Sequence, residues 1–465
     1  MSESVKVRFA PSPTGFLHIG GVRTALFNWL FARHHGGQFV LRIEDTDIER
    51  STPEAVEVIK NGMSWLNLKH DGDIVFQSKR IDRYKELIQL LINQGDAYHC
   101  YTSKQQLEEL RDKQIKEGKK PRYDGQWRPE TNKKLPDIPK NIKPVIRFKT
   151  PAEGEVSWID LVKGEIKIKN EELDDLIIAR SDGTPTYNFC VVVDDWDMKV
   201  THVVRGDDHI NNTPRQINLL KALNASIPQY AHLSMILAGD GQKLSKRHGA
   251  ASVLKFKEQG YLPEAIINYL ARLGWSHGDD EIFSAEQLGE WFDFDHVTSS
   301  SAQFDEEKLD WINNYYIKNT ANDKLANLIT PRLKSLGVDK IDKDILQKAI
   351  DLYKEREKNL NFFANDILFF FTNINPSKEL IDKYLDNESK KLIKLFINEL
   401  EGLNWNDNNI NNCLKEFVKK QEIKFPEIAM PLRSIIAGTD NTPSIGSIIY
   451  ILGIDIVKRR VSVFV

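Results

Sequence analysis

The sequence predicts an α/β protein that begins with a parallel sheet and ends in a helical region. Residues 5–9 alternate in polarity like a strand, residues 20–35 show helical apolar spacing, and residues 39–44 alternate again. A strand, a crossover helix and a second strand imply a parallel pair, whose ligands bind at the carboxyl ends of the strands. From about residue 320 the chain is rich in Lys, Asn and Leu with helical periodicity. Together these observations predict a sheet-based first part and a helical second part.

Further strands are expected along the middle of the chain. Short apolar runs at 191–193, 203–204 and 234–237 are each followed by polar or turn-forming residues. Beyond residue 320 we expect two helical subdomains, a loop at the Asn/Asp-rich stretch 404–412, and a strand signal only within the last twenty residues.

Composition limits the class of protein. The 465 residues carry 64 Lys or Arg and 67 Asp or Glu, a net charge of −3, and 41% are hydrophobic. This balance is typical of a globular protein and excludes a collagen-like or disordered chain. No apolar run approaches the roughly 18 residues that span a bilayer. The three cysteines (Cys100, Cys190 and Cys413) are far apart. We therefore expect a cytoplasmic protein without membrane segments or disulfides.

A basic segment interrupts the α/β pattern. Residues 103–147 contain thirteen Lys or Arg and seven acidic residues, a net charge of +6, with Tyr101, Tyr123 and Trp127 nearby or interleaved. Two interpretations remain open at this point. The segment is either a solvated helix with a Pro-rich surface loop, or an insert that faces RNA and neutralises its phosphates.

Two clusters could bind phosphate groups. In the first, His18 ends a strand-to-helix loop and Gly20 and Gly21 open the helix, where backbone N–H groups and the helix dipole favour an anion. Taken alone, a His before a helix is more often a cap. The second cluster, residues 243–247 (KLSKR), follows a glycine turn and suits a loop that closes over phosphates. One cluster follows the first predicted strand and the other the last, so both can reach one crevice.

Several motifs in collinear order resemble one family. PSPTGFLHIGG (11–21), LRIEDTD (41–47), THVVRGDDH (201–209), KLSKRHG (243–249) and GYLPEAIINYLARLGWS (260–276) are similar to signatures of the class I aminoacyl-tRNA synthetases, specifically the bacterial glutamyl enzymes. The usual final His of the first signature is Gly21 here, the usual Met of the second is Leu244, and its usual last Ser is Arg247.

The resemblance implies a domain order. It implies a Rossmann-like catalytic domain in two halves, 1–100 and 186–240, around an inserted tRNA acceptor-binding domain, 101–185. A mobile signature loop with a stem-contact domain would follow over 241–320. The all-helical anticodon-binding domain would occupy 321–465.

The resemblance also implies an activity. The chain would activate L-glutamate with ATP and Mg²⁺ to glutamyl-adenylate and transfer it to the 3' end of tRNA(Glu), and it would be a monomer. Zinc is not expected, because only His99 and Cys100 stand where some members carry a Cys/His cluster, and a structural site needs four ligands. Alternatives are a relaxed enzyme that also charges tRNA(Gln), and a silent paralogue that only binds tRNA.

Site residues follow from the matched motifs. Glutamate has two carboxylates and one ammonium, so its pocket needs cations twice and an anion once. The expected glutamate-binding residues are Arg8, Ser12, Glu44, Tyr187 and Arg205. The expected catalytic residues are His18, Lys243 and Lys246, and the ATP-binding set is His18, Gly20, Gly21, Asp208, Lys243, Ser245, Lys246 and Arg247. Arg356 is expected to contact the last anticodon base.

Overall fold

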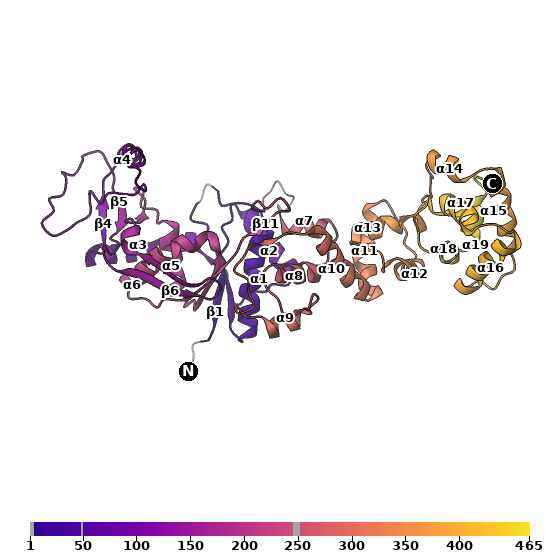
Figure 1. Ribbon diagram of the computed structural model, residues 1–465, viewed down its shortest axis with the longest axis horizontal. Coiled ribbons are helices and arrows are strands. Elements are labelled where there is room, and N and C mark those ends of the chain that lie inside the picture. Colours follow the sequence, from indigo (N-terminus) through magenta and orange to yellow (C-terminus); the bar gives the residue numbers. More distant parts are fainter. Residues whose placement is uncertain (1–3, 48–49, 245–251) are drawn as a thin grey trace. The chain divides into compact units, whose positions relative to one another are not determined.

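The computed structural model describes residues 4–47, 50–244 and 252–465 (Figure 1). The chain forms two compact units, one of Met1–Phe256 with Ile266–Asp305 and one of Lys257–Ala265 with Glu306–Val465. Among the described residues, no helix has the length and apolar character that crossing a membrane requires.

Parallel strands form the centre of the first unit. One sheet has the parallel order β1 (Lys6–Phe9), β2 (Gln38–Ile43) and β3 (Val75–Phe76). The other has the order β7 (Gly164–Lys169), β6 (Glu155–Asp160), β10 (Gln229–Leu233) and β9 (His202–Gly206), in which only β7 is antiparallel to its neighbour. A 2.9 Å hydrogen bond from Thr201 N to Lys6 O joins β1 to the start of β9. The parallel pairing predicted for residues 5–9 and 39–44 is confirmed.

Helices lie between the strands of the first unit along the chain. They are α1 (Ile19–His34), α2 (Pro53–Trp65), α3 (Ile81–Gln94), α5 (Tyr187–Asp197) and α6 (Thr213–Ala222), with the short 3-10 helices η1 (Gln77–Arg80), η2 (Asn170–Glu172) and η3 (Asp207–Asn212). Thr52 caps α2 with Pro53 in its first turn, and Gly95, at φ +83°, ends α3 in the left-handed conformation that glycine tolerates.

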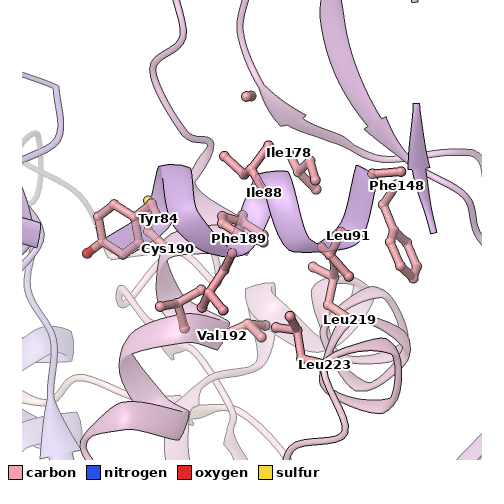
Figure 2. Close-up of a cluster of buried hydrophobic side chains, with 14 of the residues drawn as sticks. Tyr84, Ile88, Leu91, Phe148, Ile178, Phe189, Cys190, Val192, Leu219 and Leu223 are labelled. Carbon is pink, nitrogen blue, oxygen red and sulfur yellow. The ribbon is translucent and has the colours of Figure 1, made fainter. Parts of the chain in front are cut away.

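The run 191–193 lies inside α5, so the strand predicted there is wrong. A short apolar run that is buried on all sides has no periodicity that distinguishes a strand from a helix. In Figure 2, Phe189, Cys190 and Val192 of this helix pack with Tyr84 and Leu91 of α3 in one buried cluster. The valines are therefore core residues of a helix that covers the sheet.

The basic segment belongs to a small antiparallel sheet with a helix. This sheet has the order β4 (Ala97–Cys100), β5 (Val145–Phe148), β8 (Ile177–Ala179), and α4 (Lys104–Lys116) starts at a Ser103 capping box. Tyr123 and Trp127 are buried with Tyr98 and Cys100. These two aromatic residues form a local core and are not available for stacking on bases. The charged residues of α4 remain exposed or half-buried.

The remaining elements of the first unit lie after residue 235. They are the parallel pair β11 (Ile236–Leu237) and β12 (Ala302–Gln303), and the helices α7 (Val253–Glu258), α8 (Pro263–Arg272) and α9 (Ala285–Trp291), of which α7 and α8 cross the boundary between the units. The strand predicted at 234–237 is thus the two-residue β11, outside the main sheets.

The second unit is helical throughout 306–465. Its helices are α10 (Glu306–Asn319), α11 (Asn322–Ser335), α12 (Lys343–Tyr353), α13 (Leu360–Asp366), α14 (Lys378–Tyr384), α15 (Asn387–Glu399), α16 (Asp407–Lys420), α17 (Phe425–Ala437), α18 (Ile445–Leu452) and α19 (Ile454–Val461), with the 3-10 helix η5 (Leu368–Phe370). The loop predicted over 404–412 is wrong in its second half, because Asn406 caps α16 and the helix starts at Asp407. The strand signal in the last twenty residues is also wrong, since α18 and α19 occupy them.

Candidate active site

A cavity of 520 Å³ lies at the carboxyl ends of the parallel strands of the first unit. Phe9 of β1, Glu44 after β2, Gly206 of β9 and Leu233 of β10 all line it. The chain runs from β1 to β2 on one side and from β9 to β10 on the other. Ligands of open α/β sheets bind where the strand order reverses in this way.

His18 lies at the wall of this cavity and caps α1. Its Nδ1 accepts a 3.1 Å hydrogen bond from Gly21 N, so in the neutral ring Nε2 carries the proton. Burial, and next the nearby Lys243 charge, lower the pKa of His18, although Asp208 opposes them. The ring is therefore a neutral donor at pH 7. It satisfies the helix end with one nitrogen and can donate to an oxyanion with the other.

Gly20 leaves room for this ring. A Cβ on Gly20 would approach His18 Nδ1 to 3.2 Å, closer than most real contacts. The first turn of α1 holds no acidic residue, so nothing there offsets the positive end of the helix dipole. Both glycines line the cavity.

Lys243 and Asp208 face each other on the same cavity wall. The Lys243 ammonium lies 3.6 Å from Asp208 Oδ2, and both side chains are about half exposed. Gly206 permits this arrangement, since a Cβ there would meet Asp208 Oδ1 at 2.6 Å. Ser245, Lys246 and Arg247, the rest of the predicted phosphate loop, lie outside the described residues.

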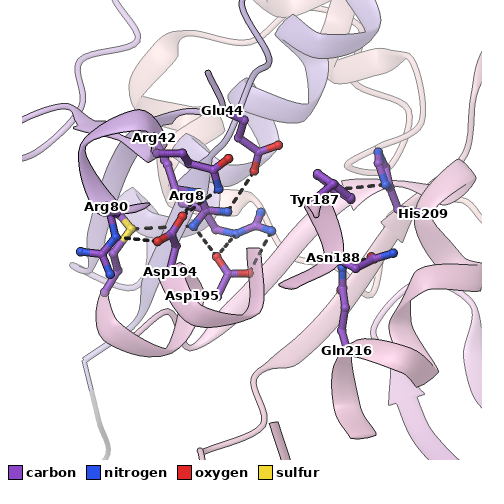
Figure 3. A network of polar contacts seen from close by, with 12 residues as sticks. Arg8, Arg42, Glu44, Arg80, Tyr187, Asn188, Asp194, Asp195, His209 and Gln216 are labelled. Carbon is purple, nitrogen blue, oxygen red and sulfur yellow. Dashed lines mark hydrogen bonds and ion pairs between the residues drawn. The ribbon is translucent and has the colours of Figure 1, made fainter. Parts of the chain in front are cut away.

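Arg8 is anchored from behind by a carboxylate that the sequence analysis missed. Its Nε and Nη2 lie 3.0 and 3.3 Å from the two oxygens of Asp195 (Figure 3), and Nη1 lies 3.4 Å from Val204 O. The Nε–Nη2 edge of Arg8 is therefore occupied, and the Nη1–Nη2 end of the guanidinium keeps hydrogens for a ligand. Burial alone would raise the pKa of Asp195, but the charges of Arg8 and Arg42 outweigh it and lower the pKa.

Glu44 is also held from within the protein. Arg42 Nη2 donates to Glu44 Oε1 at 3.2 Å, and both side chains are buried (Figure 3). Burial raises the pKa of Glu44 despite the opposing charges of Arg42 and Arg8. A cationic group entering the cavity would stabilise the ionised form of this carboxyl.

Arg205 has one free end. Its Nε lies 3.2 Å from His232 Nε2, and its Nη2 lies 2.9 Å from Thr213 Oγ1. Its Nη1 is buried and has no hydrogen-bond partner among the described residues. A buried guanidinium with an unused donor at a cavity wall fits an anionic group of a ligand.

The two neutral residues of the predicted glutamate set also line the cavity. Tyr187 OH lies 3.3 Å from His209 Nδ1 (Figure 3), and Ser12 is exposed in the loop after β1. The structure thus brings Arg8, Ser12, Glu44, Tyr187 and Arg205 together with His18, Gly20, Gly21, Asp208 and Lys243 around one cavity.

The supporting charges could have been found only in part from sequence. Arg42 stands two residues before Glu44 on a predicted strand, which places both on one face and was a usable signal. Asp194 and Asp195 follow the apolar run 191–193, whose lack of a period does not predict a helix, so the sequence does not indicate their position on α5.

Arg356 belongs to the second unit. It follows α12 in a turn, and its Nη2 donates to Asn441 Oδ1 at 2.9 Å. It borders a cavity of 700 Å³ together with Glu357 and Asp366.

Metal ligands are not gathered in the described ranges. No group of three or more His, Cys, Asp or Glu side chains there is arranged to hold a metal ion. Cys100, the one soft ligand predicted near a zinc position, contacts Thr102 Oγ1 and Tyr123 OH at 3.5 Å each. The absence of zinc remains a prediction.

Comparison with known proteins defines the class. Residues 4–311 match the catalytic domain of the tRNA synthetases class I (E and Q), and residues 324–465 match an anticodon binding domain. The chain belongs to this family of class I tRNA synthetases.

Among its relatives, the glutamate–tRNA ligase of Methylobacillus flagellatus is 58% identical over 97% of this chain and 96% of its own length, and that of Herminiimonas arsenicoxydans is 56% identical over 98% of each. A glutamate tRNA ligase from Elizabethkingia meningosepticum, crystallised in complex with its amino acid, superimposes with a TM-score of 0.89 at 30% identity over 99% of both chains. The family and the fold class predicted from the sequence are confirmed.

Proposed function

We propose that this chain is a glutamate–tRNA ligase, which couples L-glutamate, ATP and tRNA(Glu) in two steps. The charge pattern of the cavity is the observation that carries the proposal. The Lys243–Asp208 pair and Arg23, whose Nη1 and Nη2 donate to Leu273 O and Ser234 O, line the 520 Å³ cavity. The remaining charged groups of the lining are the guanidinium groups of Arg8 and Arg205 and the carboxylate of Glu44. Free glutamate presents the complementary set, two carboxylates and one ammonium. The two relatives of this chain from Methylobacillus flagellatus and Herminiimonas arsenicoxydans are both named glutamate–tRNA ligase.

Glutamate recognition would use the protein-held side chains as a fixed frame. Glu44 would take the ammonium, and Arg205 Nη1 one carboxylate. The second carboxylate would lie toward Arg8, whose Nη1 keeps one hydrogen after its contact with Val204 O. Tyr187 and Ser12 would add neutral hydrogen bonds. Because the guanidinium groups are already oriented, little side-chain entropy is lost on binding.

ATP would bind at the start of α1. Class I synthetases use ATP, and here His18 Nε2–H and the Gly20 and Gly21 end of the helix would contact phosphate oxygens. Lys243, with Lys246 of the same motif, would stabilise the charge that develops as pyrophosphate leaves. Ser245, Arg247 and Asp208 complete the proposed ATP set. Mg²⁺ would bind mainly to the phosphates and neutralise their charge, consistent with how this ion is usually held.

The tRNA would be bound by further parts of the chain. The insert proposed for 101–185 offers exposed cations on α4 for the acceptor end, and the region proposed for 321–465 would read the anticodon, with Arg356 at its last base. We retain the remaining domain limits (1–100, 186–240 and 241–320) as part of this proposal.

Glutamate-dependent exchange between ATP and pyrophosphate tests the function. We expect exchange with glutamate and tRNA(Glu) and none with glutamine in place of glutamate. Absence of exchange with tRNA present would leave the silent, tRNA-binding paralogue as the explanation. Charging of tRNA(Gln) at a rate equal to tRNA(Glu) would instead indicate the relaxed enzyme.

A further inference from the structure

Behind Arg205, three buried side chains from neighbouring strands form a hydrogen-bonded row. Asp160 ends β6, His232 lies on β10 and Arg205 on β9, and His232 stands directly opposite Arg205 in the parallel register. Asp160 Oδ2 lies 2.5 Å from His232 Nδ1, and His232 Nε2 lies 3.2 Å from Arg205 Nε. The exposed fractions of the three residues are 2%, 0% and 5%, so water does not replace these bonds.

The chemistry of the partners fixes the tautomer of His232. An ionised carboxylate only accepts, so Nδ1 must carry a proton, and a guanidinium only donates, so Nε2 must be the unprotonated acceptor. Burial lowers the pKa of His232, in agreement with a neutral ring, although Asp160 opposes that shift. Asp160 thus fixes the orientation of the His232 ring, and the ring fixes the orientation of the Arg205 guanidinium.

Arg205 lines the cavity, and this row fixes the orientation of its guanidinium. Nε is held by His232 and Nη2 by Thr213, which leaves Nη1 as the donor without a partner among the described residues. If Nε lost its acceptor, rotation of the guanidinium would bring other donors toward the cavity, and the position of Nη1 would be lost.

We propose that Asp160 and His232 are positioning residues that hold Arg205 Nη1 in place for a carboxylate of glutamate. The inference rests on the proposed function. Neither residue lines the cavity, so both act through Arg205 and not on the substrate.

Asp160→Asn tests this with little change of shape. Asp160 Oδ1 accepts from three backbone groups, Val162 N, Lys163 N and His232 N, at 3.0–3.1 Å. The amide oxygen of Asn must occupy that place, so its NH₂ faces His232 Nδ1. This forces the proton to Nε2, where it faces the Nε–H of Arg205, donor against donor. The proton can then be accepted only by Thr213 Oγ1, 3.2 Å away, so His232 no longer holds Arg205 Nε.

The expected result is a rise in the KM for glutamate of about tenfold to hundredfold, the equivalent of one hydrogen bond to a charged group. The KM for ATP and the melting temperature should change little. His232→Gln, whose amide can donate to Asp160 and accept from Arg205, should restore most of the affinity, whereas His232→Leu should not. In an Arg205→Ala background, Asp160→Asn should have no further effect on the KM for glutamate.

Asp175→Asn is the matched control, because this carboxylate is also buried and is bonded to Tyr98, Thr150 and Arg128, and not to His232 or Arg205. It should leave the KM for glutamate unchanged. An unchanged KM in Asp160→Asn, or equal effects of Asp160→Asn in the wild-type and Arg205→Ala backgrounds, would overturn the inference. A wild-type chain without glutamate-dependent exchange would overturn the proposed function as well.

A measurement on the wild type keeps the inference testable if a variant does not fold. The nitrogen NMR shifts of His232 should show a proton on Nδ1 and none on Nε2 at neutral pH. The opposite tautomer, or a protonated ring, would contradict the proposed row.

Discussion

Arg42 Nη2 lies 3.2 Å from Glu44 Oε1, and the two residues stand two positions apart, so they share one face of the sheet edge. Arg42 Nη1 also lies 2.6 Å from Asp195 Oδ1, and the same carboxylate holds Arg8. Glu44, which is proposed to bind the ammonium of glutamate, is therefore linked through Arg42 and Asp195 to Arg8, which is proposed to bind a carboxylate. A change at Asp195 or Arg42 should disturb both ends of the glutamate pocket.

Arg42→Met should destabilise the first unit by about 3–5 kcal/mol, because it removes the buried cation that pairs with Glu44 and leaves Asp195 with Arg8 as its remaining buried partner. Urea unfolding followed by tryptophan fluorescence would measure this. Arg33→Met is the control: Arg33 pairs with Asp71 near the surface, and such pairs contribute about 0–1 kcal/mol. Equal losses in the two variants would contradict a special role of the buried network.

Arg205→Ala should lower the kcat/KM for glutamate by the equivalent of about 2–5 kcal/mol, as expected when one partner of a buried charge contact is truncated. The KM for ATP should stay the same, since the phosphate-binding groups lie at α1. Arg215→Ala is a suitable control, because Arg215 lies on α6, which follows β9 in the chain, and pairs with Asp174 outside the lining of the cavity. Loss of ATP binding with intact glutamate affinity would place Arg205 in the other subsite.

His18→Asn should separate the two roles of this side chain. Asn is among the best N-cap residues, so helix α1 should keep its cap and its stability, whereas His18→Ala should cost about 1 kcal/mol. Asn is too short to replace Nε2–H at a phosphate. We therefore expect the exchange rate to fall in both variants and the melting temperature to fall only in His18→Ala. An active His18→Asn enzyme would show that the residue is only a cap.

The parts that the sequence predicted are those that depend on local pattern. Alternation gave β1 and β2, and Gly20 and Gly21 marked the start of α1. The strand predicted at 191–193 was wrong because three valines in a row carry no period. For the basic segment two interpretations stayed open, because aromatic residues among cations look alike in sequence whether they contact RNA or pack into a local core, as Tyr123 and Trp127 do. The pocket residues came from motifs. Their supports, Asp195, Asp160 and His232, depend on which strands lie side by side, and a single sequence does not contain that information.

Glu357 should make the stability of the helical unit depend on pH. Burial, and next the neighbouring Asp366 carboxyl, raise the pKa of Glu357 from 4.5 to about 8. The folded chain then holds a proton that the unfolded chain releases above pH 4.5, so the free energy of unfolding should fall as the pH rises toward 8. One proton corresponds to at most about 1.4 kcal/mol per pH unit.

Glu357→Gln should flatten this dependence and raise the melting temperature at pH 8 relative to the wild type. Thermal unfolding between pH 5 and 8, followed by circular dichroism, would measure it. Glu355→Gln, at an exposed position two residues earlier, should leave the pH dependence unchanged. A stability that rises over this range in the wild type would contradict the protonated state of Glu357.

Arg356→Gln should narrow the difference in charging between tRNA(Glu) and tRNA(Gln) by about 1–3 kcal/mol, the value of one base contact. The two tRNAs differ at the third anticodon base, C against G. A guanidinium has donors only, and C offers acceptors on its pairing edge, but G also has acceptors, so the shape of the 700 Å³ cavity beside Arg356 must contribute to the choice.

The anticodon effect should be seen with full-length tRNA and be absent with a minihelix that lacks the anticodon. Lys348→Gln is the control, because it removes one positive charge from the neighbouring α12, where Lys348 pairs with Asp344. If Lys348 or Arg356 contacts only phosphates, its replacement should weaken the binding of tRNA(Glu) and tRNA(Gln) equally and leave the discrimination between them unchanged. Unchanged discrimination in Arg356→Gln, or efficient charging of tRNA(Gln) by the wild type, would contradict strict recognition through this arginine.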